Sequence, residues 1–399
     1  MTSIARISID KQIPLLPKEV QFCRNCVVSN QRPRTRFTED GICSACLWAY
    51  EKDHAIDWNA RAQELEELCD RYRSKDGDFD VVVPGSGGKD SGFVAHQLKE
   101  RYGMHPLCVT WSPFEYTDIG WQNLQNFIGS GFNNILGQPD RSLHRKLARI
   151  AFELVGDPWQ PFTYGQKGWA FHIATRFGVK LIMYGENGEL EYGGSEKYKH
   201  QPKEGPEEWT EEYFKGAEID KLAGVGIELN ILNEKDLTPK SLQLYRPPDP
   251  DLILESGAEM HWYSYYHKWV PEENYYYCVE HTGFQPNPDG RSEGTYTKYV
   301  SLDDKLDGFH WYLSSMKFGM GRASRDAQTD IRRHHITREE GVALTRRYDG
   351  EFPQRHFQWF LDYLDITEER FWEVCDYYRS LSNVWKKEGD RWKLEFVVS

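Results

Sequence analysis

The segment Gly85-Ser86-Gly87-Gly88-Lys89-Asp90-Ser91 decides the fold of this chain. It follows Phe79-Asp80-Val81-Val82-Val83, whose β-branched run predicts a buried strand. It precedes residues 92–101, which the pattern predicts as a helix opened by Asp90 or Ser91. Glycines let backbone N–H groups approach a phosphate closely, and the N-terminus of a helix adds a positive dipole. The sequence therefore predicts a strand, a glycine turn and a helix that together cradle an anion.

The order of residues in this turn distinguishes it from two common phosphate loops. The Walker pattern G-x-x-x-x-G-K-[ST] and the dinucleotide pattern G-x-G-x-x-G both require glycine where this chain has Asp90. The pattern that remains, S-G-G-x-D-S after a strand, resembles the pyrophosphate loop of the ATP pyrophosphatase (PP-loop) superfamily. Members of that superfamily cleave ATP between the α and β phosphates and adenylate a carbonyl-type oxygen. The alternative is a glycine turn that holds no ligand.

The cysteines divide into a clustered set and a scattered set. The clustered set has the spacing C-x2-C-x16-C-x2-C and comprises Cys23, Cys26, Cys43 and Cys46. Two short knuckles at this separation can place four thiolates at the corners of a tetrahedron, so we predict a closed, structural Zn²⁺ site that folds residues 20–50. The alternatives are disulfides or free thiols, and a cytoplasmic setting disfavours disulfides. The scattered set, predicted to lie in the core, is Cys69, Cys108, Cys278 and Cys375.

Composition limits the class of protein. At 399 residues the chain is long for one core. The mean hydropathy is −0.71, and no apolar run approaches the roughly 18 residues of a membrane span. We therefore expect a cytoplasmic protein without a membrane span or secretion signal. The net charge of −13 disfavours nucleic acid as a partner unless a local basic face overrides it.

The order of predicted elements indicates an α/β fold. Strand and helix patterns alternate from residue 57 to residue 184, which predicts a parallel sheet with helices on both faces. Ligands bind such sheets at the carboxyl ends of strands, so Trp111 and residues 185–189 are expected on the same rim as the glycine turn. Residues 194–218, rich in Gly, Pro and charge, are predicted to form a mobile loop or lid, or a plain solvated insertion.

We expect three regions along the chain. Residues 1–56 form an irregular arm and the zinc module, and residues 57–235 form the ATP-binding domain. The alternation is expected to stop near residue 235. Residues 236–399 are predicted to be a mainly helical substrate-binding extension, with a capping box at Thr337-Arg338-Glu339-Glu340 that begins one of its helices.

Four segments together resemble one family, the N-acetyl sugar amidotransferases. They are the cysteine module, VVVPGSGGKDS at 81–91, LIMYGENGELEYGG at 181–194, and KFGMGRASRDAQTDIRRHHITREEGVALTRRYDGEFP at 317–353. The resemblance covers about residues 20–385. It implies an adenine nucleotide alpha hydrolase-like PP-loop domain. It also implies an enzyme that converts an acetamido group of an anionic bacterial sugar into an acetamidino group, for lipopolysaccharide O-chains or flagellin glycans.

The resemblance also implies roles for the turn and for the rim of the sheet. The pyrophosphate leaving ATP would be held by Ser86, Gly87, Gly88, Lys89 and Ser91, and Asp90 would help to hold Mg²⁺. Glu186 and Glu189 would hold Mg²⁺ or accept a proton from ammonia, or they are solvated loop carboxylates. Trp111 would border the adenine or pack in the core.

The sugar, with or without an attached nucleotide, is expected to be anionic. Guanidinium groups bind carboxylates and phosphates bidentately. The candidate sugar ligands are therefore the cations of the last family segment, Lys317, Arg322, Arg325 and Arg332. The alternative is that they form surface ion pairs with Asp326 and Asp330.

Ammonia is expected to come from another protein. A self-contained glutaminase needs a cysteine at the mature N-terminus or in a G-x-C-x-G elbow; position 2 is threonine, and none of the scattered cysteines fits the elbow. The family resemblance implies a separate glutaminase and a barrel subunit, similar to the two subunits of imidazole glycerol phosphate synthase.

Two other functions are compatible with the same motifs. PP-loop enzymes that thiolate tRNA also combine zinc knuckles with this turn, but a tRNA-binding protein should be basic and many thiolases have further paired cysteines. A zinc-stabilised scaffold that binds a nucleotide without turnover is the non-enzymatic alternative, and the intact Lys89 and Asp90 count against it.

Overall fold

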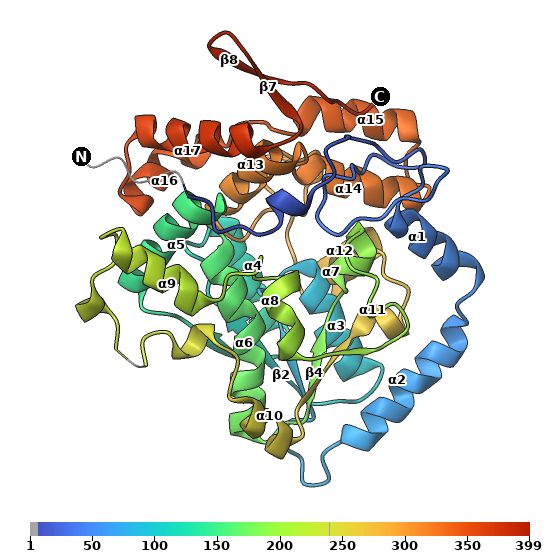
Figure 1. Ribbon diagram of the computed structural model, residues 1–399. Coiled ribbons are helices and arrows are strands. Elements are labelled where there is room, and N and C mark those ends of the chain that lie inside the picture. Colours follow the sequence, from blue (N-terminus) through green and yellow to red (C-terminus); the bar gives the residue numbers. More distant parts are fainter. Residues whose placement is uncertain (1–6, 239) are drawn as a thin grey trace.

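The computed structural model describes residues 7–238 and 240–399, and its centre is a six-stranded sheet (Figure 1). The strand order is β3-β2-β1-β4-β6-β5, and every neighbouring pair is parallel except β6 with β5. The strands are β1 Val81–Pro84, β2 Pro106–Trp111, β3 Asn133–Gly137, β4 Leu181–Tyr184, β5 Lys203–Glu204 and β6 Glu259–Trp262. The prediction of an α/β fold built on a parallel sheet is confirmed.

Helices surround this sheet and make up most of the rest of the described chain. The α-helices are α1 Ser44–His54, α2 Trp58–Tyr72, α3 Lys89–Glu100, α4 Asp118–Gly129, α5 Arg141–Val155, α6 Gln160–Phe177, α7 Gly188–Tyr192, α8 Trp209–Glu212, α9 Ile219–Glu228, α10 Pro250–Ser256, α11 Tyr263–Tyr266, α12 Pro271–His281, α13 Asp307–Phe318, α14 Arg322–Arg332, α15 Arg338–Tyr348, α16 Phe357–Leu364 and α17 Glu368–Leu381. The 3-10 turns are η1 Ile13–Leu15, η2 Pro206–Glu208, η3 Glu234–Asp236, η4 Gln243–Tyr245 and η5 Gln354–His356. None of the helices in the described residues is long and apolar enough to cross a membrane.

Both faces of the sheet are buried. Successive side chains of a strand point to opposite faces. Val81 and Val83 accordingly pack in one core cluster with Phe93 of α3, whereas Val82 packs in another with residues of α5 and α6. Burial on both faces explains why β1 is a continuous run of valines rather than an alternating pattern.

One difference from the predicted elements concerns helix α6. The sequence pattern predicts a helix over 166–177, but α6 begins at Gln160, because Pro161 occupies the first turn, where its fixed φ and missing N–H are tolerated.

Another difference is that the alternation does not stop near residue 235. Strand β6, at 259–262, pairs in parallel with β4. The sheet is therefore completed by residues beyond the boundary expected from the sequence.

The C-terminal region is helical, as predicted, and it shares the core of the sheet domain. Phe309 of α13 stacks on Phe360 of α16 with ring centroids 4.0 Å apart, and Phe371 of α17 stacks on Phe152 of α5. The predicted capping box at Thr337 and Glu340 is present at the start of α15. The hairpin of β7 Trp385–Glu388 and β8 Arg391–Leu394 was not predicted.

The N-terminal segment packs beside the C-terminal helices (Figure 1). The first six residues of the expected arm lie outside the described residues. From residue 7 the arm is irregular but anchored, since Ile9 donates its backbone N–H to Leu154 of α5 at 2.8 Å and is nearly buried. The cysteine module forms a small core with Ala327 and Ile331 of α14.

The segment 194–218 is not the solvated insertion that the sequence allowed. It contributes the edge strand β5 and the short helix α8. Trp209 of α8 is fully buried and packs against Phe171 of α6. Phe214 is also buried and packs against Tyr164 of α6, so several apolar side chains anchor this charged segment to the core.

Candidate functional site

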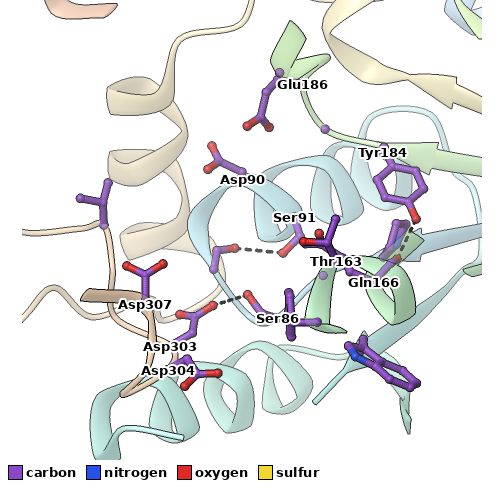
Figure 2. Close-up of a pocket in the computed structure, with 18 of the residues that line it drawn as sticks. Ser86, Asp90, Ser91, Thr163, Gln166, Tyr184, Glu186, Asp303, Asp304 and Asp307 are labelled. Carbon is purple, nitrogen blue, oxygen red and sulfur yellow. Dashed lines mark hydrogen bonds between the residues drawn. The ribbon is translucent and has the colours of Figure 1, made fainter. Parts of the chain in front are cut away.

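A cavity of about 560 Å³ lies at the carboxyl ends of β1 and β4. The strand order reverses between these two strands, and ligands of open parallel sheets bind at such a reversal. Its lining comes from the turn after β1, the segment after β4, helix α6 and residues 299–307 (Figure 2). Residues 185–189 and Trp111 do lie on the same rim as the glycine turn, as predicted.

The glycine turn after β1 depends on glycine at particular positions. Gly87 has a φ of +84°, and a Cβ there would lie 2.5 Å from the Cα of Leu124 in α4. A Cβ on Gly85 would overlap the side chain of Ser91. The chain therefore turns in the narrow space between α3 and α4, where a side chain would displace it.

Helix α3 begins at Lys89, three residues earlier than the sequence predicted. Its N-cap is Gly88, and Lys89, Asp90 and Ser91 all lie in its first turn. Gly88 takes the extended cap conformation but has no side chain to bond the first N–H groups of the helix. These N–H groups are free to bind an external anion, which is how a helix N-terminus holds phosphate.

The polar side chains of the turn form a connected set. The Lys89 ammonium is buried and donates to the Asp90 carboxylate. The other oxygen of Asp90 accepts a hydrogen bond from Asn274 Nδ2 at 3.1 Å. Ser91 Oγ donates to the carbonyl of Gly88 at 3.2 Å, and Ser86 Oγ donates to Asp303. Except for Gly87, the residues predicted for ATP thus lie together in the cavity wall.

Glu186, which follows β4, brings a second carboxylate to the turn. Its side chain points toward that of Asp90 (Figure 2). Tyr192 Oη donates to Glu186 Oε1 at 3.2 Å, and Arg325 Nη2 lies 3.9 Å from the same oxygen. Burial, together with the charge of Asp90, raises the pKa of Glu186 above its usual range. Two carboxylates held this close suit a divalent cation or a shared proton.

Three aspartates of the segment 299–307 were missed by the sequence analysis. Asp303 accepts the Ser86 hydrogen bond, and burial raises its pKa to about 6. Asp304 accepts backbone N–H groups of Phe114 at 2.5 Å and Leu306 at 2.9 Å, which fixes the segment against the end of β2. Asp307 lines the same cavity. The available signal was three acids within five residues, 303–307, next to the buried leucines 302 and 306.

Glu189 lies in the cavity wall, but both its oxygens are occupied. Arg34 donates from Nε to Oε2 at 2.8 Å and from Nη2 to Oε1 at 2.9 Å. Burial alone would raise the pKa of Glu189, yet the hydrogen bonds and charge of Arg34 hold it below its usual value. Glu189 is therefore better suited to hold the cysteine module against the cavity than to accept a proton.

Trp111 lines the cavity and is also a core residue. It is 4% exposed, and its indole lies against the backbone of α6, where a Cβ on Gly165 would collide with the ring. Its packing in the core is confirmed, and its contact with an adenine stays a prediction.

The predicted sugar ligands divide into two groups. Arg322 and Arg325, from the first turn of α14, line the cavity. Arg322 Nε also lies 3.1 Å from Asp326 Oδ1. One of the ion pairs that the sequence allowed as an alternative role for these cations is therefore present.

The other two predicted cations do not line the cavity. Lys317 is 2% exposed and donates to Asp10 and to the carbonyl of Val155 at 2.8 Å. Arg332 donates to the carbonyl of Glu191 at 2.7 Å and lies 3.8 Å from Cys26 Sγ. Their assignment to the sugar site is wrong, because the helices that carry them turn these side chains toward the arm and the cysteine module.

The four clustered cysteines are all buried, and their sulfur atoms lie within 4.8 Å of one another. The Sγ atoms of Cys23 and Cys46 are 3.8 Å apart, and those of Cys26 and Cys43 are 3.7 Å apart. Tetrahedral zinc with Zn–S bonds of about 2.3 Å requires sulfur separations of about 3.8 Å. The cluster can bind a metal, and its four thiols fit zinc.

A family model matches the C-terminal part of the chain. Residues 293–397 match the family model described as LPS biosynthesis protein WbpG-like, C-terminal domain. An uncharacterized protein of Methanocaldococcus jannaschii, MJ1599, is 28% identical over 88 residues, which cover 22% of this chain and 31% of that protein. The match thus spans about a third of the length of that curated relative.

A solved structure, that of NMN synthetase from Francisella tularensis, aligns with 64% of this chain and 93% of that chain at 12% identity. The TM-score is 0.27, which is too low to support a conclusion about either protein.

The fold and the site define the class of protein as a parallel α/β protein with a phosphate-type glycine turn, a helical C-terminal region and a four-cysteine cluster. The C-terminal quarter of the chain matches the WbpG-like lipopolysaccharide biosynthesis proteins. That match contains the segment 317–353, so it supports the resemblance to the N-acetyl sugar amidotransferases.

Proposed function

We propose that this chain is an AMP-forming amidotransferase of lipopolysaccharide O-antigen or flagellin glycan synthesis. It would use ATP and ammonia to convert an acetamido group of an anionic sugar into an acetamidino group. The observation that supports this most directly is one cavity that joins the glycine turn, a set of carboxylates and two arginines of the family-matched region.

The two substrates fit opposite parts of the cavity. The N–H groups of the first turn of α3, with Ser86, Ser91 and Lys89, suit the β and γ phosphates. Asp90 and Glu186, with Asp303 nearby, would hold Mg²⁺, which would offset the phosphate charge. Arg322 and Arg325 suit the anionic sugar.

The proposed reaction has two steps, adenylation of the amide oxygen and displacement of AMP by ammonia. The amide oxygen attacks the α phosphorus, the bond between the α and β phosphates breaks, and pyrophosphate remains at the turn. Ammonia then attacks the amide carbon and loses one proton, and the carbon–oxygen bond breaks as AMP leaves. Where Glu186 does not hold Mg²⁺, it is suited to accept that proton, because burial and the charge of Asp90 raise its pKa above its usual range.

Ammonia would come from a separate glutaminase and barrel subunit. The four scattered cysteines are all buried, and burial raises the pKa of Cys69, Cys278 and Cys375 to about 12. Thiols of this kind are protonated at neutral pH and are poor nucleophiles. The chain alone should therefore use ammonium salts but not glutamine.

The test is a single incubation of the purified chain with ATP, Mg²⁺, ammonium and candidate acetamido sugars. We expect AMP and pyrophosphate, and a sugar product in which NH replaces the amide oxygen, detected by mass spectrometry and by its new positive charge. Asp90→Asn should abolish the product, whereas Asp70→Asn, on the exposed side of α2, should not. Release of ADP, or turnover that requires tRNA, would refute the proposal.

A further inference from the structure

Arg32, in the loop between the two cysteine knuckles, reaches the cavity from outside the PP-loop region. Its Nη2 lies 4.0 Å from Glu189 Oε1, which is beyond hydrogen-bond distance. Its Nε is buried and has no hydrogen-bond partner among the described residues. A guanidinium with unused donors on a cavity wall is suited to an anionic ligand.

Glu189 cannot satisfy Arg32. Arg34 already takes both of its oxygens in a bidentate pair, and the backbone N–H of Ser195 donates to Oε2 at 2.8 Å. Glu189 therefore positions Arg34 and the loop, and Arg32 remains as a second cation beside a carboxylate that is already neutralised.

Arg325, on α14, lines the same cavity. Its nearest carboxylate oxygen, Glu186 Oε1, is 3.9 Å from Nη2, and its Nε also has no partner in the part of the chain that the structure describes. The guanidinium lies over the ring of Tyr192 at 3.7 Å and near that of Trp311 at 5.3 Å. It is held in place by aromatic faces rather than by an anion.

The two guanidinium groups are close enough to repel each other. Burial lowers the pKa of Arg32 to about 10, and although Glu189 opposes this shift, the charges of Arg325 and Arg34 add to it. Two cations that line one cavity are at higher free energy without an anion between them. Binding an anion would relieve the repulsion and satisfy the unused donors.

We propose that Arg32 and Arg325 together bind the carboxylate of the acetamido sugar, so that the cysteine module contributes directly to the substrate site. This inference rests on the proposed function, since it assigns one group of its substrate. A carboxylate suits the pair because each guanidinium can present two parallel N–H donors to its two oxygens.

The four-cysteine cluster then also positions substrate-binding residues, in addition to folding its own loop. The segment that carries Arg32 and Arg34 lies between the two pairs of cysteines. Arg332 of α14, next to Cys26 Sγ at 3.8 Å, connects the cluster to the helix that carries Arg325. Metal binding would therefore fix the separation of the two guanidinium groups.

The test is a binding titration without ATP or ammonium, followed by tryptophan fluorescence and calorimetry. The probes are N-acetylneuraminate, an acetamido sugar acid, and its methyl ester, in which an uncharged ester group replaces the carboxylate. We expect the acid to bind at least ~10-fold more tightly than the ester, since hydrogen bonds to a charged group are stronger than neutral ones. Arg32→Met should abolish that preference, and Arg24→Met, an exposed arginine of the same module, should retain it.

The outcomes separate this inference from the proposed function. Equal binding of acid and ester by the wild type, or an unchanged preference in a folded Arg32→Met variant, would overturn the subsite. Stronger competition by UMP than by the acid would show that the arginines hold a nucleotide phosphate, which also overturns it. Retained preference for the acid without any amidine product in the full reaction would refute the proposed function and leave the subsite intact. Circular dichroism and thermal melting establish that each variant is folded.

Discussion

Replacing Gly87 with alanine tests the phosphate turn most sharply. The residue has φ = +84°, where any residue other than glycine costs roughly 1–2 kcal/mol. The new Cβ would also lie 2.5 Å from Leu124 Cα, about 1 Å closer than ordinary van der Waals contact. The turn must therefore move by about 1 Å, and a displacement of that size can reduce turnover by about 100-fold.

A matched control separates the two effects. Gly77 has almost the same backbone angle, φ = +87°, but a Cβ there would meet nothing within 4 Å. Gly77→Ala should lower the free energy of unfolding by about 1–2 kcal/mol and leave turnover unchanged. Gly87→Ala should lose at least as much stability and should also lose about 100-fold in pyrophosphate release, about 2.7 kcal/mol of transition-state stabilisation.

The assays are urea denaturation for stability and pyrophosphate release in the amidotransfer reaction for turnover. Wild-type turnover by a folded Gly87→Ala variant would refute the assignment of the turn to the nucleotide. An equal loss of turnover in Gly77→Ala would show that general destabilisation, and not displacement of the turn, is responsible.

Three further perturbations test other parts of the molecule. Because burial raises the pKa of Asp303 to about 6, its carboxylate is ionised above that pH and takes up a proton as the pH falls through it. Turnover should fall below about pH 6, and Asp303→Asn should remove that limb of the pH–rate profile; a limb that persists in the variant would assign it to another group. Lys317→Met would leave the carboxylate of Asp10 buried without its cation, which should lower the free energy of unfolding by about 3–5 kcal/mol while the sugar KM stays unchanged. A raised KM without loss of stability would return Lys317 to the sugar site. Chelation of zinc should make the four clustered thiols reactive and lower the thermal stability, and thiols that react equally with and without chelator would contradict a metal site.

The site was predictable where its residues are close in sequence. The turn 85–91 and the four cysteines are short patterns with a defined chemistry, and the structure brings the residues of each together as expected. Glu186 was found because it directly follows a predicted strand. Contacts over long sequence distances could not be found this way. Asp303 reaches Ser86 across 217 positions, and no local pattern distinguishes it from an acidic surface loop.

The cations of the last family segment show the same limit. Nothing in the sequence distinguishes among the four predicted sugar ligands, Lys317, Arg322, Arg325 and Arg332. In the structure, only Arg322 and Arg325, in the first turn of α14, line the cavity. Lys317 and Arg332 point elsewhere because the periodicity of a helix distributes neighbouring side chains around its axis. Which face meets the cavity depends on how the helix packs, and that packing involves residues of the N-terminal arm and the cysteine module.

The sequence by itself determined the parallel α/β fold, the glycine turn after the first sheet strand and the four-thiol cluster, because each follows from backbone preferences or ligand spacing within a few residues. Only the tertiary structure decided that β6 completes the sheet, that Asp303 joins the turn, and that Arg32 of the cysteine module and Arg325 of α14 line the same cavity. Burial and charge interactions across the fold select these contacts. They depend on which surfaces meet in space, and a linear pattern does not contain that information.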